Sequence, residues 1–218
     1  MRHYPALLLA ALWTIGSSAA IGQSDVRSIA RQVDSHYNHL RSMQAEFVET
    51  YRGGEVSREE SGMLWLKRPR KMRWEYHQPR EKLFISDGKY AWFYIPGEPE
   101  VRKSPTKNLE DLRSPIAYML GHTKLEKEFD GLSLAPDVLP TSPGNISLRG
   151  VPKAMPQVSQ IVLEITPDRK ISRIMVDEVD GSTTEYRFSE HKENLPVDDQ
   201  RFRFSPPAGT EVINAAIQ

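Results

Sequence analysis

Apolar residues recur at helical spacing near the start of the chain and then give way to segments in which apolar and polar residues alternate. Ser24 and Asp25 precede the helical pattern, where they suit the N-cap and the first turn of a helix. The apolar positions of the pattern are Val26, Ile29, Ala30, Val33, Tyr37 and Leu40. This spacing predicts one amphipathic helix whose apolar stripe packs on a sheet.

The two-residue alternation that follows is typical of β-strands and falls into two groups of segments. The first group, in which Asp87 and Gly88 form a tight turn, comprises residues 46–51, 62–67, 71–77, 82–86 and 89–95. The second group comprises residues 160–166, 171–177, 183–189 and 201–204. So many strands favour one antiparallel sheet, which curls as it grows and needs helices to cover its concave face. A curled sheet with an apolar lining encloses a cavity suited to an apolar ligand.

Two stretches between these groups depart from the alternation. Ser114, Pro115 and Gly121 suit the cap, first position and end of a short helix whose apolar face carries Ile116, Met119 and Leu120. Residues 135–156 contain five prolines, which oppose regular structure apart from a possible strand at 146–149. The whole pattern predicts one antiparallel sheet with an N-terminal helix and a helical insertion in mid-chain.

The N-terminus has the order of charge, apolar run and small residues that is typical of a secretory signal peptide. Arg2 precedes the apolar residues 6–15, and small residues follow at 17–20. We therefore expect residues 1–22 to be a cleaved signal peptide and residues 23–218 to form a single domain; the alternative is a buried helix at residues 4–15. The absence of cysteine excludes disulfides, thiolate chemistry and a lipid-anchored cysteine, and an exported chain of this kind points to the bacterial periplasm.

Charge and motifs argue against several classes of function. Lys plus Arg and Asp plus Glu each number 29, so no overall field attracts nucleic acid or an anionic membrane. The chain has no Gly-x-Ser-x-Gly, phosphate-loop or dinucleotide motif, and His36 and His39 lack a third metal ligand at a suitable spacing. We interpret the carboxylate pairs at 59–60 and 198–199 as solvated. The sequence therefore offers no catalytic residue, metal site or cofactor.

Five cations interrupt a stretch suited to a hydrophobic core between Gly62 and Pro79. With interleaved aromatic residues they resemble a patch for nucleic acid, but export and the zero net charge oppose that interpretation. We interpret four of them as a solvated hairpin connection: Lys67, Arg70, Lys71 and Arg73.

The fifth cation, Arg68, is placed differently by the alternation of side chains along a strand. Arg68 shares a face with Leu64 and Leu66, while Met72 and Trp74 share one face of the next strand. A guanidinium at the end of an apolar row needs acceptors, and the carbonyls at a helix end supply them where the helix dipole also favours a cation. Arg68 is therefore a candidate latch between the sheet and a covering helix. The alternatives are that Arg68 extends to water and that Met72 and Trp74 are ordinary core residues.

Four stretches of the chain resemble the LolA family, the periplasmic carriers of outer-membrane lipoproteins. They are "GMLWLKRPRKMRWEY", "KLFISDGKYAWFYIP", "SPIAYMLG" and "FRFSPPAGTEV", in that order along the chain. The resemblance implies a mostly β fold with helices, an incomplete, half-open antiparallel β-barrel with an α-helical lid over an apolar cavity for acyl chains. Arg68 falls on the family's lid-latching arginine. The family's apolar strand and lid positions fall on Leu64, Leu66, Met72, Trp74, Ile116, Met119 and Leu120.

The resemblance also implies partners and leaves two competing functions. A member of the family takes acylated lipoproteins from an ABC-type extractor in the inner membrane and passes them to an outer-membrane lipoprotein receptor, without catalysis or a cofactor. We expect the chain to be a monomer. Residues 135–156 have no counterpart that we can align, and the chain ends soon after its Pro-Pro-Ala-Gly motif, so a family contact made by a longer C-terminal segment stays open. The competitors are a lipoprotein-sensing regulatory domain on the same fold and a lipid-modifying hydrolase.

Overall fold

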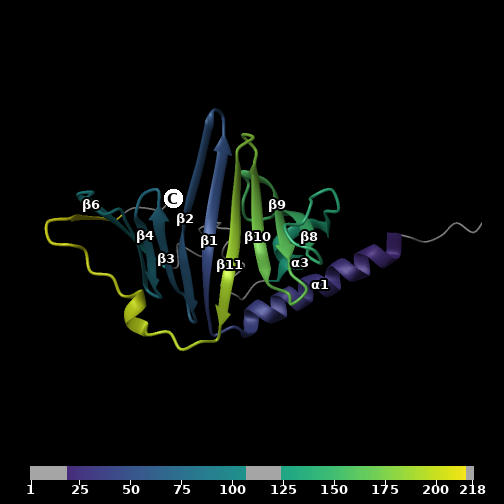
Figure 1. The fold of residues 1–218 in the computed structure, drawn as a ribbon, viewed down its shortest axis with the longest axis horizontal. Coiled ribbons are helices and arrows are strands. Elements are labelled where there is room, and N and C mark those ends of the chain that lie inside the picture. The colour runs from purple at the N-terminus through teal and green to yellow at the C-terminus, as the bar shows by residue number, and fades with distance from the viewer. Residues whose placement is uncertain (1–18, 107–123, 215–218) are drawn as a thin grey trace, which may run out of the picture.

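The computed structural model describes residues 19–106 and 124–214, in which twelve strands form one sheet (Figure 1). The strands follow the order β12-β6-β5-β4-β3-β2-β1-β11-β10-β9-β8-β7 across the sheet. Neighbours run antiparallel except β12, which runs parallel to β6. The first six strands are β1 (Ser42–Gly53), β2 (Val56–Lys67), β3 (Lys71–Gln78), β4 (Lys82–Asp87), β5 (Tyr90–Tyr94) and β6 (Glu100–Pro105). The others are β7 (Phe129–Leu134), β8 (Ile146–Pro152), β9 (Val158–Ile165), β10 (Ile171–Glu178), β11 (Thr183–Glu193) and β12 (Glu211–Asn214).

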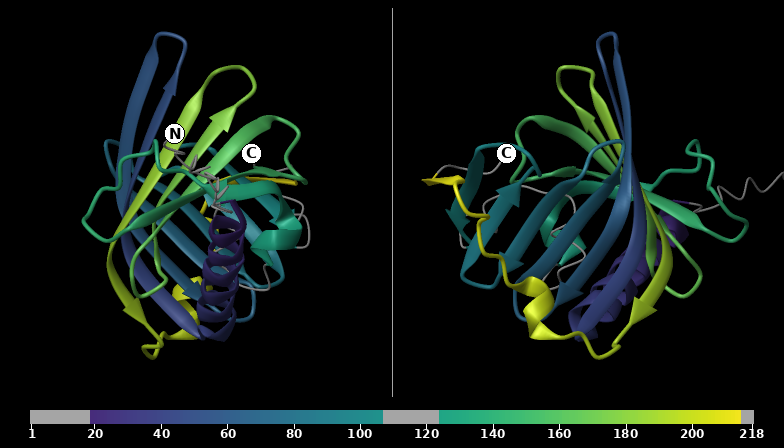
Figure 2. Two further views of the ribbon diagram at one scale, coloured as in Figure 1. Left: turned by 90° about the vertical axis from the view of Figure 1, so that its right-hand side faces the viewer. Right: turned by 60° about the vertical axis from the view of Figure 1, so that its left-hand side comes forward.

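The sheet curls without closing, because β7 and β12 stand at opposite ends of the strand order (Figure 2). The helix α1 (Ala19–His39) lies against its concave side, which we call the inner face. A short helix, α3 (Leu125–Glu128), leads into β7, and a 3-10 helix, η2 (Asp199–Phe202), follows β11. The predicted mostly β fold, an incomplete barrel covered by helix, is confirmed.

Most of the predicted elements are confirmed, and one predicted strand is wrong. The possible strand at 146–149 is β8, and the predicted first helix is α1, although α1 already begins at Ala19 and not after Ser24. The strand predicted at 201–204 is wrong, because the Asp198 side chain accepts the backbone N–H of Gln200 and starts η2 there. The sequence pattern missed β6, β7 and β12. The predicted helix with Ile116, Met119 and Leu120 lies outside the described residues.

The inner face and α1 share one hydrophobic core. Along α1 the buried side chains recur every three or four residues and form a single stripe of Val26, Ala30, Val33 and Tyr37, which Leu40 continues just after the helix ends. The strands contribute alternate residues to the same core, among them Phe47, Ile161 and Ile174. Because each buried methylene contributes about 0.8 kcal/mol, this shared burial is what holds α1 on the sheet.

The proline-rich stretch crosses the opposite, outer face of β9 and β10, where a buried ion pair binds it. Glu164 has no exposed surface, and its carboxylate lies 2.7 Å from the guanidinium of Arg173. Glu164 accepts hydrogen bonds from Thr141 and Asn145, and Arg173 donates to the carbonyl of Leu139. Burial alone would raise the pKa of Glu164, but these hydrogen bonds and Arg173 outweigh it and lower the pKa.

Candidate functional site

The four strand residues assigned to an acyl-chain site by the sequence lie together on the inner face. Leu64, Leu66, Met72 and Trp74 are all buried and belong to the core that includes α1. The register explains this placement, since Leu64 pairs with Trp74 and Leu66 with Met72 across β2 and β3. In the described part of the chain these side chains therefore serve as core as well as candidate lining.

Aromatic rings extend this apolar surface from β3 to β11. The ring of Phe47 lies 4.7 Å from that of Trp74 and 4.9 Å from that of Tyr76. Tyr186 and Phe188 on β11 complete the group, at 5.9 and 6.4 Å from Trp74. We call these five residues the aromatic cluster.

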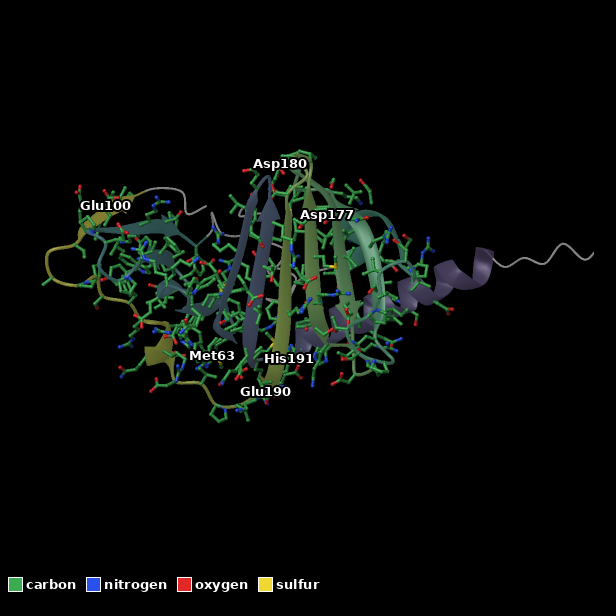
Figure 3. All side chains as sticks on the ribbon, turned by 45° about the horizontal axis from the view of Figure 1, so that its top comes forward. Met63, Glu100, Asp177, Asp180, Glu190 and His191 are labelled. Carbon is green, nitrogen blue, oxygen red and sulfur yellow. The ribbon has the colours of Figure 1, made fainter. Side chains whose placement is uncertain are left out.

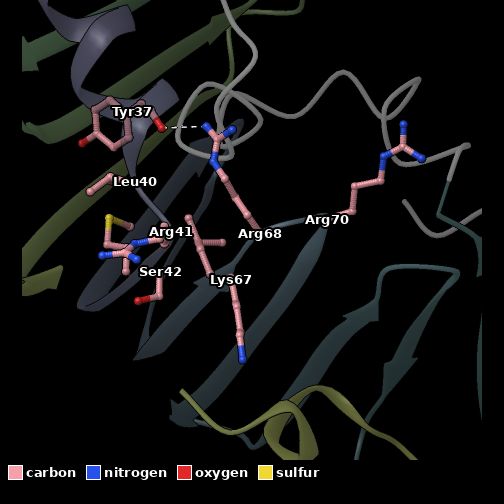
Figure 4. Close-up of a pocket in the computed structure, with 9 residues that line it drawn as sticks. Tyr37, Leu40, Arg41, Ser42, Lys67, Arg68 and Arg70 are labelled. Atoms are coloured by element: carbon pink, nitrogen blue, oxygen red, sulfur yellow. Dashed lines mark hydrogen bonds between the residues drawn. The ribbon is translucent and has the colours of Figure 1, made fainter. Parts of the chain in front are cut away.

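Arg68 joins β2 to the C-terminal end of α1 (Figure 4). Its Nη2 donates a 2.8 Å hydrogen bond to the backbone carbonyl of Tyr37, two residues before α1 ends at His39. The carbonyls of the last helical turn lack partners within the helix and carry the negative end of the helix dipole, so both effects favour a guanidinium here. The expected contact between Arg68 and a helix end is present, and the helix is α1.

The side chain of Tyr37 ties the same turn of α1 to the other half of the sheet. Its hydroxyl accepts a 2.7 Å hydrogen bond from the backbone N–H of Ile171, where β10 begins. Burial raises the pKa of Tyr37, so the hydroxyl stays neutral. His36, one residue earlier, lies 3.0 Å from Glu193 on β11. The C-terminal half of α1 is thus fixed to both β2 and β10.

The space beside Arg68 is small. A pocket of about 20 Å³ lies there, lined by the end of α1, the start of β1 and the turn between β2 and β3 (Figure 4). This volume suits about one water molecule, whereas pockets for small organic ligands measure about 300–1,000 Å³. The described residues at this point are therefore packed against one another, and an acyl chain would need them to separate.

Three of the four cations interpreted as solvated are instead bound to the segment after β11. Lys67 and Lys71 lie 2.6 and 2.7 Å from the carboxylate of Asp199, and Arg73 donates to the carbonyl of Arg201. The lysine ammonium groups lower the pKa of Asp199 to about 2. These contacts hold η2 on the outer face of β2 and β3, so the cations serve as a clamp for a segment about 130 residues away.

The histidines and carboxylate pairs also have individual positions. His36 contacts Glu193 and His39 contacts the carbonyl of Ser35, so the two imidazoles have different partners. Within residues 19–106 and 124–214, no three side chains of His, Asp or Glu are grouped to hold a metal ion. Glu60, interpreted as solvated, is instead buried on the inner face, where the Lys82 ammonium lies 2.5 Å from its carboxylate.

Glu49 stands beside Glu60 on the inner face and was not identified from the sequence. The two residues are paired across β1 and β2, and Glu49 is also paired with Tyr186 across β1 and β11. The hydroxyl of Tyr76 donates a 2.7 Å hydrogen bond to Glu49 Oε2. Burial raises the pKa of Glu49, although this hydrogen bond opposes the shift. The two-residue alternation along β1 places Glu49 on the inner face, and this alternation is the only sequence signal for its position.

Comparison with known proteins decides the family. Residues 38–205 match the family described as outer membrane lipoprotein carrier protein LolA. The chain belongs to the LolA family. The match begins at the end of α1 and includes Arg68, the aromatic cluster and η2. The resemblance seen in the four sequence stretches is confirmed.

Individual relatives of this LolA-family chain are similar over most of its length. An outer-membrane lipoprotein carrier protein of Nitrosospira multiformis is 29% identical over 186 residues, which cover 83% of this chain and 86% of that protein. The protein of the same name from Proteus mirabilis is 28% identical, with 92% and 96% covered. That of Chromobacterium violaceum is 26% identical, with 97% of both covered.

Solved structures share the fold at lower identity. A conserved uncharacterized protein from Thermus thermophilus is 16% identical, with a TM-score of 0.55 over 88% of this chain and 99% of that chain. The lipoprotein LppX of Mycobacterium tuberculosis is 12% identical, with a TM-score of 0.53 over 80% and 98%. In the described ranges of the LolA-family chain, no helix is long and apolar enough to cross a membrane.

Proposed function

We propose that this chain is a periplasmic carrier that binds the acyl chains of lipoproteins released from the inner membrane and delivers them to an outer-membrane receptor. The match to the lipoprotein carrier family over residues 38–205 carries the proposal. In this proposal residues 1–22 are a signal peptide, residues 23–218 form one monomeric carrier domain, and an ABC-type extractor in the inner membrane supplies the cargo. The chain binds and releases its cargo without catalysis.

The free energy of an acyl chain in water explains why a carrier is needed. At about 0.8 kcal/mol per methylene, a chain of about 16 carbons opposes transfer through water by on the order of 10 kcal/mol. A carrier must offset most of this cost and still release the chain to the next protein. The binding site must therefore carry an opposing free energy of its own.

The contacts between α1 and the sheet are suited to supply that opposition. An acyl chain that enters between them would separate Arg68 from the Tyr37 carbonyl and expose apolar side chains that are now packed together. A charge-assisted hydrogen bond contributes about 1.5–3 kcal/mol, and exposure of apolar area adds to it. In this proposal Arg68 is the latch, and its candidate acyl surface comprises Leu64, Leu66, Met72, Trp74, Ile116, Met119 and Leu120.

Replacement of Arg68 with Leu tests the latch. The Arg68→Leu protein should take up lipoprotein but release little to a receptor, because the bond that closure restores is gone. Mass spectrometry of the protein purified from the periplasm should then find more acylated lipoprotein bound to the variant than to the wild type. Arg52→Leu, an exposed arginine at the far end of β1, is the control and should resemble the wild type.

Two outcomes would separate the latch from the function. Normal transfer by Arg68→Leu would overturn the latch while leaving the carrier intact. A wild-type protein that never carries acylated lipoprotein, even when the extractor is active, would overturn the carrier function itself.

A further inference from the structure

The inner face carries a buried carboxylate, Glu49, beside its apolar surface. A purely apolar ligand would form no hydrogen bond with this group. Glu49 is only 9% exposed and lies next to the aromatic cluster, paired across the strands with Tyr186. In the described part of the chain no Lys, Arg or His lies within ion-pair distance of Glu49, and its carboxylate accepts a hydrogen bond from the neutral hydroxyl of Tyr76. An ionised carboxylate in such a place costs free energy.

The neighbouring carboxylate, Glu60, differs from Glu49 because two cations lie close enough to neutralise its charge. Lys82 lies 2.5 Å and Arg58 3.3 Å from the same oxygen of Glu60. Lys82 also stands 4.2 Å from the centre of the Tyr76 ring. Both cations form their ion pairs with Glu60 and act on Glu49 only from a longer distance, so the Glu49 carboxylate keeps capacity to accept hydrogen bonds.

A second polar group of the same surface has no partner among the described residues. The indole N–H of Trp74 is buried without an acceptor, and the whole side chain is 3% exposed. Trp74 and Tyr76 are alternate residues of β3 and their rings lie 6.2 Å apart. The surface thus presents a free donor at Trp74 and an acceptor at Glu49, with Tyr76 between them.

We propose that Trp74 and Glu49 recognise the polar junction at which acyl chains join a peptide. Trp74 donates to a carbonyl of the junction, and Glu49 accepts from its N–H group, either an amide or a free ammonium. The aromatic cluster contacts the first methylenes of the chains. The inference rests on the carrier function proposed above and adds that the carrier distinguishes an acylated peptide from a plain lipid.

The test compares three ligands that share their chains and differ at the junction. They are a diacylated lipopeptide with a free N-terminal ammonium, the same lipopeptide with a third, amide-linked chain, and dihexadecylglycerol, an ether lipid with neither carbonyl nor N–H. Binding to the chain without residues 1–22 is followed by isothermal titration calorimetry, which does not depend on Trp74. The readout is the affinity for each lipopeptide divided by the affinity for the ether lipid.

Glu49→Gln should lower this ratio about 10-fold or more, the value of one hydrogen bond to a charged group. Trp74→Phe, which keeps a ring but loses the N–H, should lower it less, because its hydrogen bond is between neutral groups. Glu46→Gln is the matched control, since Glu46 lies on the same strand and is exposed on the other face. A loss confined to the diacylated peptide identifies the ammonium as the partner, a loss confined to the peptide with three chains identifies the amide of its third chain, and an equal loss identifies a backbone amide that both peptides share.

The failures are distinguishable. If the wild type binds all three ligands and Glu49→Gln leaves the ratio unchanged, the junction site is overturned and the carrier function stands. If the wild type binds none of the three, the carrier function is overturned and the junction site with it.

Discussion

Gly62 shows how one missing side-chain atom sets the path of the sheet. The pairing of β2 with β3 shifts register between Ser61 and Gly62, and a Cβ at Gly62 would overlap the carbonyl oxygen of Glu75. At this point the backbones approach more closely than any other residue permits. This register shift lies between the end of β2 that packs against α1 and the buried carboxylate of Glu60.

Gly62→Ala should therefore destabilise the fold by about 3 kcal/mol, because β3 must move to make room. The midpoint of urea unfolding measures the loss. Ser61→Ala, one residue away, should stay within about 0.5 kcal/mol of the wild type. Similar losses in both variants would show that the close approach is not what constrains this position.

In contrast to Gly62, replacement of Glu49 is expected to stabilise the fold, and the effect should depend on pH. Burial raises the pKa of Glu49 above its ordinary value of 4.5. A group whose pKa is raised by folding contributes its full stability below the unfolded pKa and loses it as the pH rises through the higher folded pKa. Glu49→Gln, which has no charge to desolvate, should therefore raise Tm at pH 7 and change it less at pH 4.

Thermal unfolding at both pH values checks this expectation. Glu46→Gln should give a small change that is the same at both, because Glu46 is exposed. A lower Tm for Glu49→Gln at pH 7 would mean that the carboxylate is stabilising. A higher Tm for Glu49→Gln at pH 7 would mean that Glu49 lowers the stability of the fold, which is typical of a residue in a binding site.

At the scale of elements, buried polar contacts decide which loops stay on the sheet. The stretch at residues 135–145 has too many prolines to pair as a strand, so hydrogen bonds to Glu164 and Arg173 hold it on the outer face. Lys67 and Lys71 hold η2 in the same way through Asp199. Each clamp joins a segment outside the strands to the sheet.

Glu164→Gln should release the first clamp. Loss of one partner from a buried ion pair leaves the other charge uncompensated, and we expect a cost of about 3 kcal/mol in urea unfolding. Limited proteolysis should then cut within residues 135–145 faster than in the wild type. Ser142→Ala, at an exposed residue of the same stretch, should leave both measurements nearly unchanged. Unaltered proteolysis of Glu164→Gln would contradict the clamp.

At the scale of the whole molecule, the proposed carrier works by separating α1 from a sheet that otherwise stays intact. The contacts that must break are local to α1 and include the bonds from Ile171 N–H to the Tyr37 hydroxyl and from Leu125 N–H to Asp34. The β1–β2 ladder has no part in that movement.

Hydrogen exchange should therefore change selectively when the protein is loaded with a diacylated lipopeptide. We expect faster exchange at Ile171 and Leu125, because their acceptors move away with α1, and unchanged exchange in the centre of β1 and β2. Mass spectrometry of matched peptides measures both. Uniform protection across all these amides would indicate that cargo binds without displacing α1.

The two ends of the sheet place these movements in the molecule. Asp180 marks the tip of the hairpin between β10 and β11, and Glu190 and His191 lie at the opposite end of β11 (Figure 3). The end with Glu190 is the one that meets the C-terminus of α1, where His36 contacts Glu193 and Arg68 contacts Tyr37. Glu49 lies nearer the other end. The latch and Glu49 therefore lie toward opposite ends of the inner face, with Trp74 between them along the strands.

The local pattern of the sequence was enough for the elements and for the inner face. Helical and two-residue periods depend on near neighbours, so they placed α1 and most strands, and they put Leu64, Leu66 and Arg68 on one side of β2. The motifs around Arg68 and Pro206 were specific enough to indicate the family. Where local chemistry competed with the pattern, as at the Asp198 cap of η2, the prediction of a strand was wrong.

Tertiary structure alone decided the partners of the charged residues. Lys71 and Asp199 are far apart in the chain, and Glu164 and Thr141 are separated by more than one turn. From sequence alone such a charged residue is interpreted as solvated, because its partner comes close only in the folded chain. The same holds for Glu49, whose burial depends on β1, β3 and β11 meeting. Periodicity fixes which side a residue faces, because it is a property of one strand. Which residues it contacts on that side is a property of the whole sheet, because the contacts depend on how distant strands are paired.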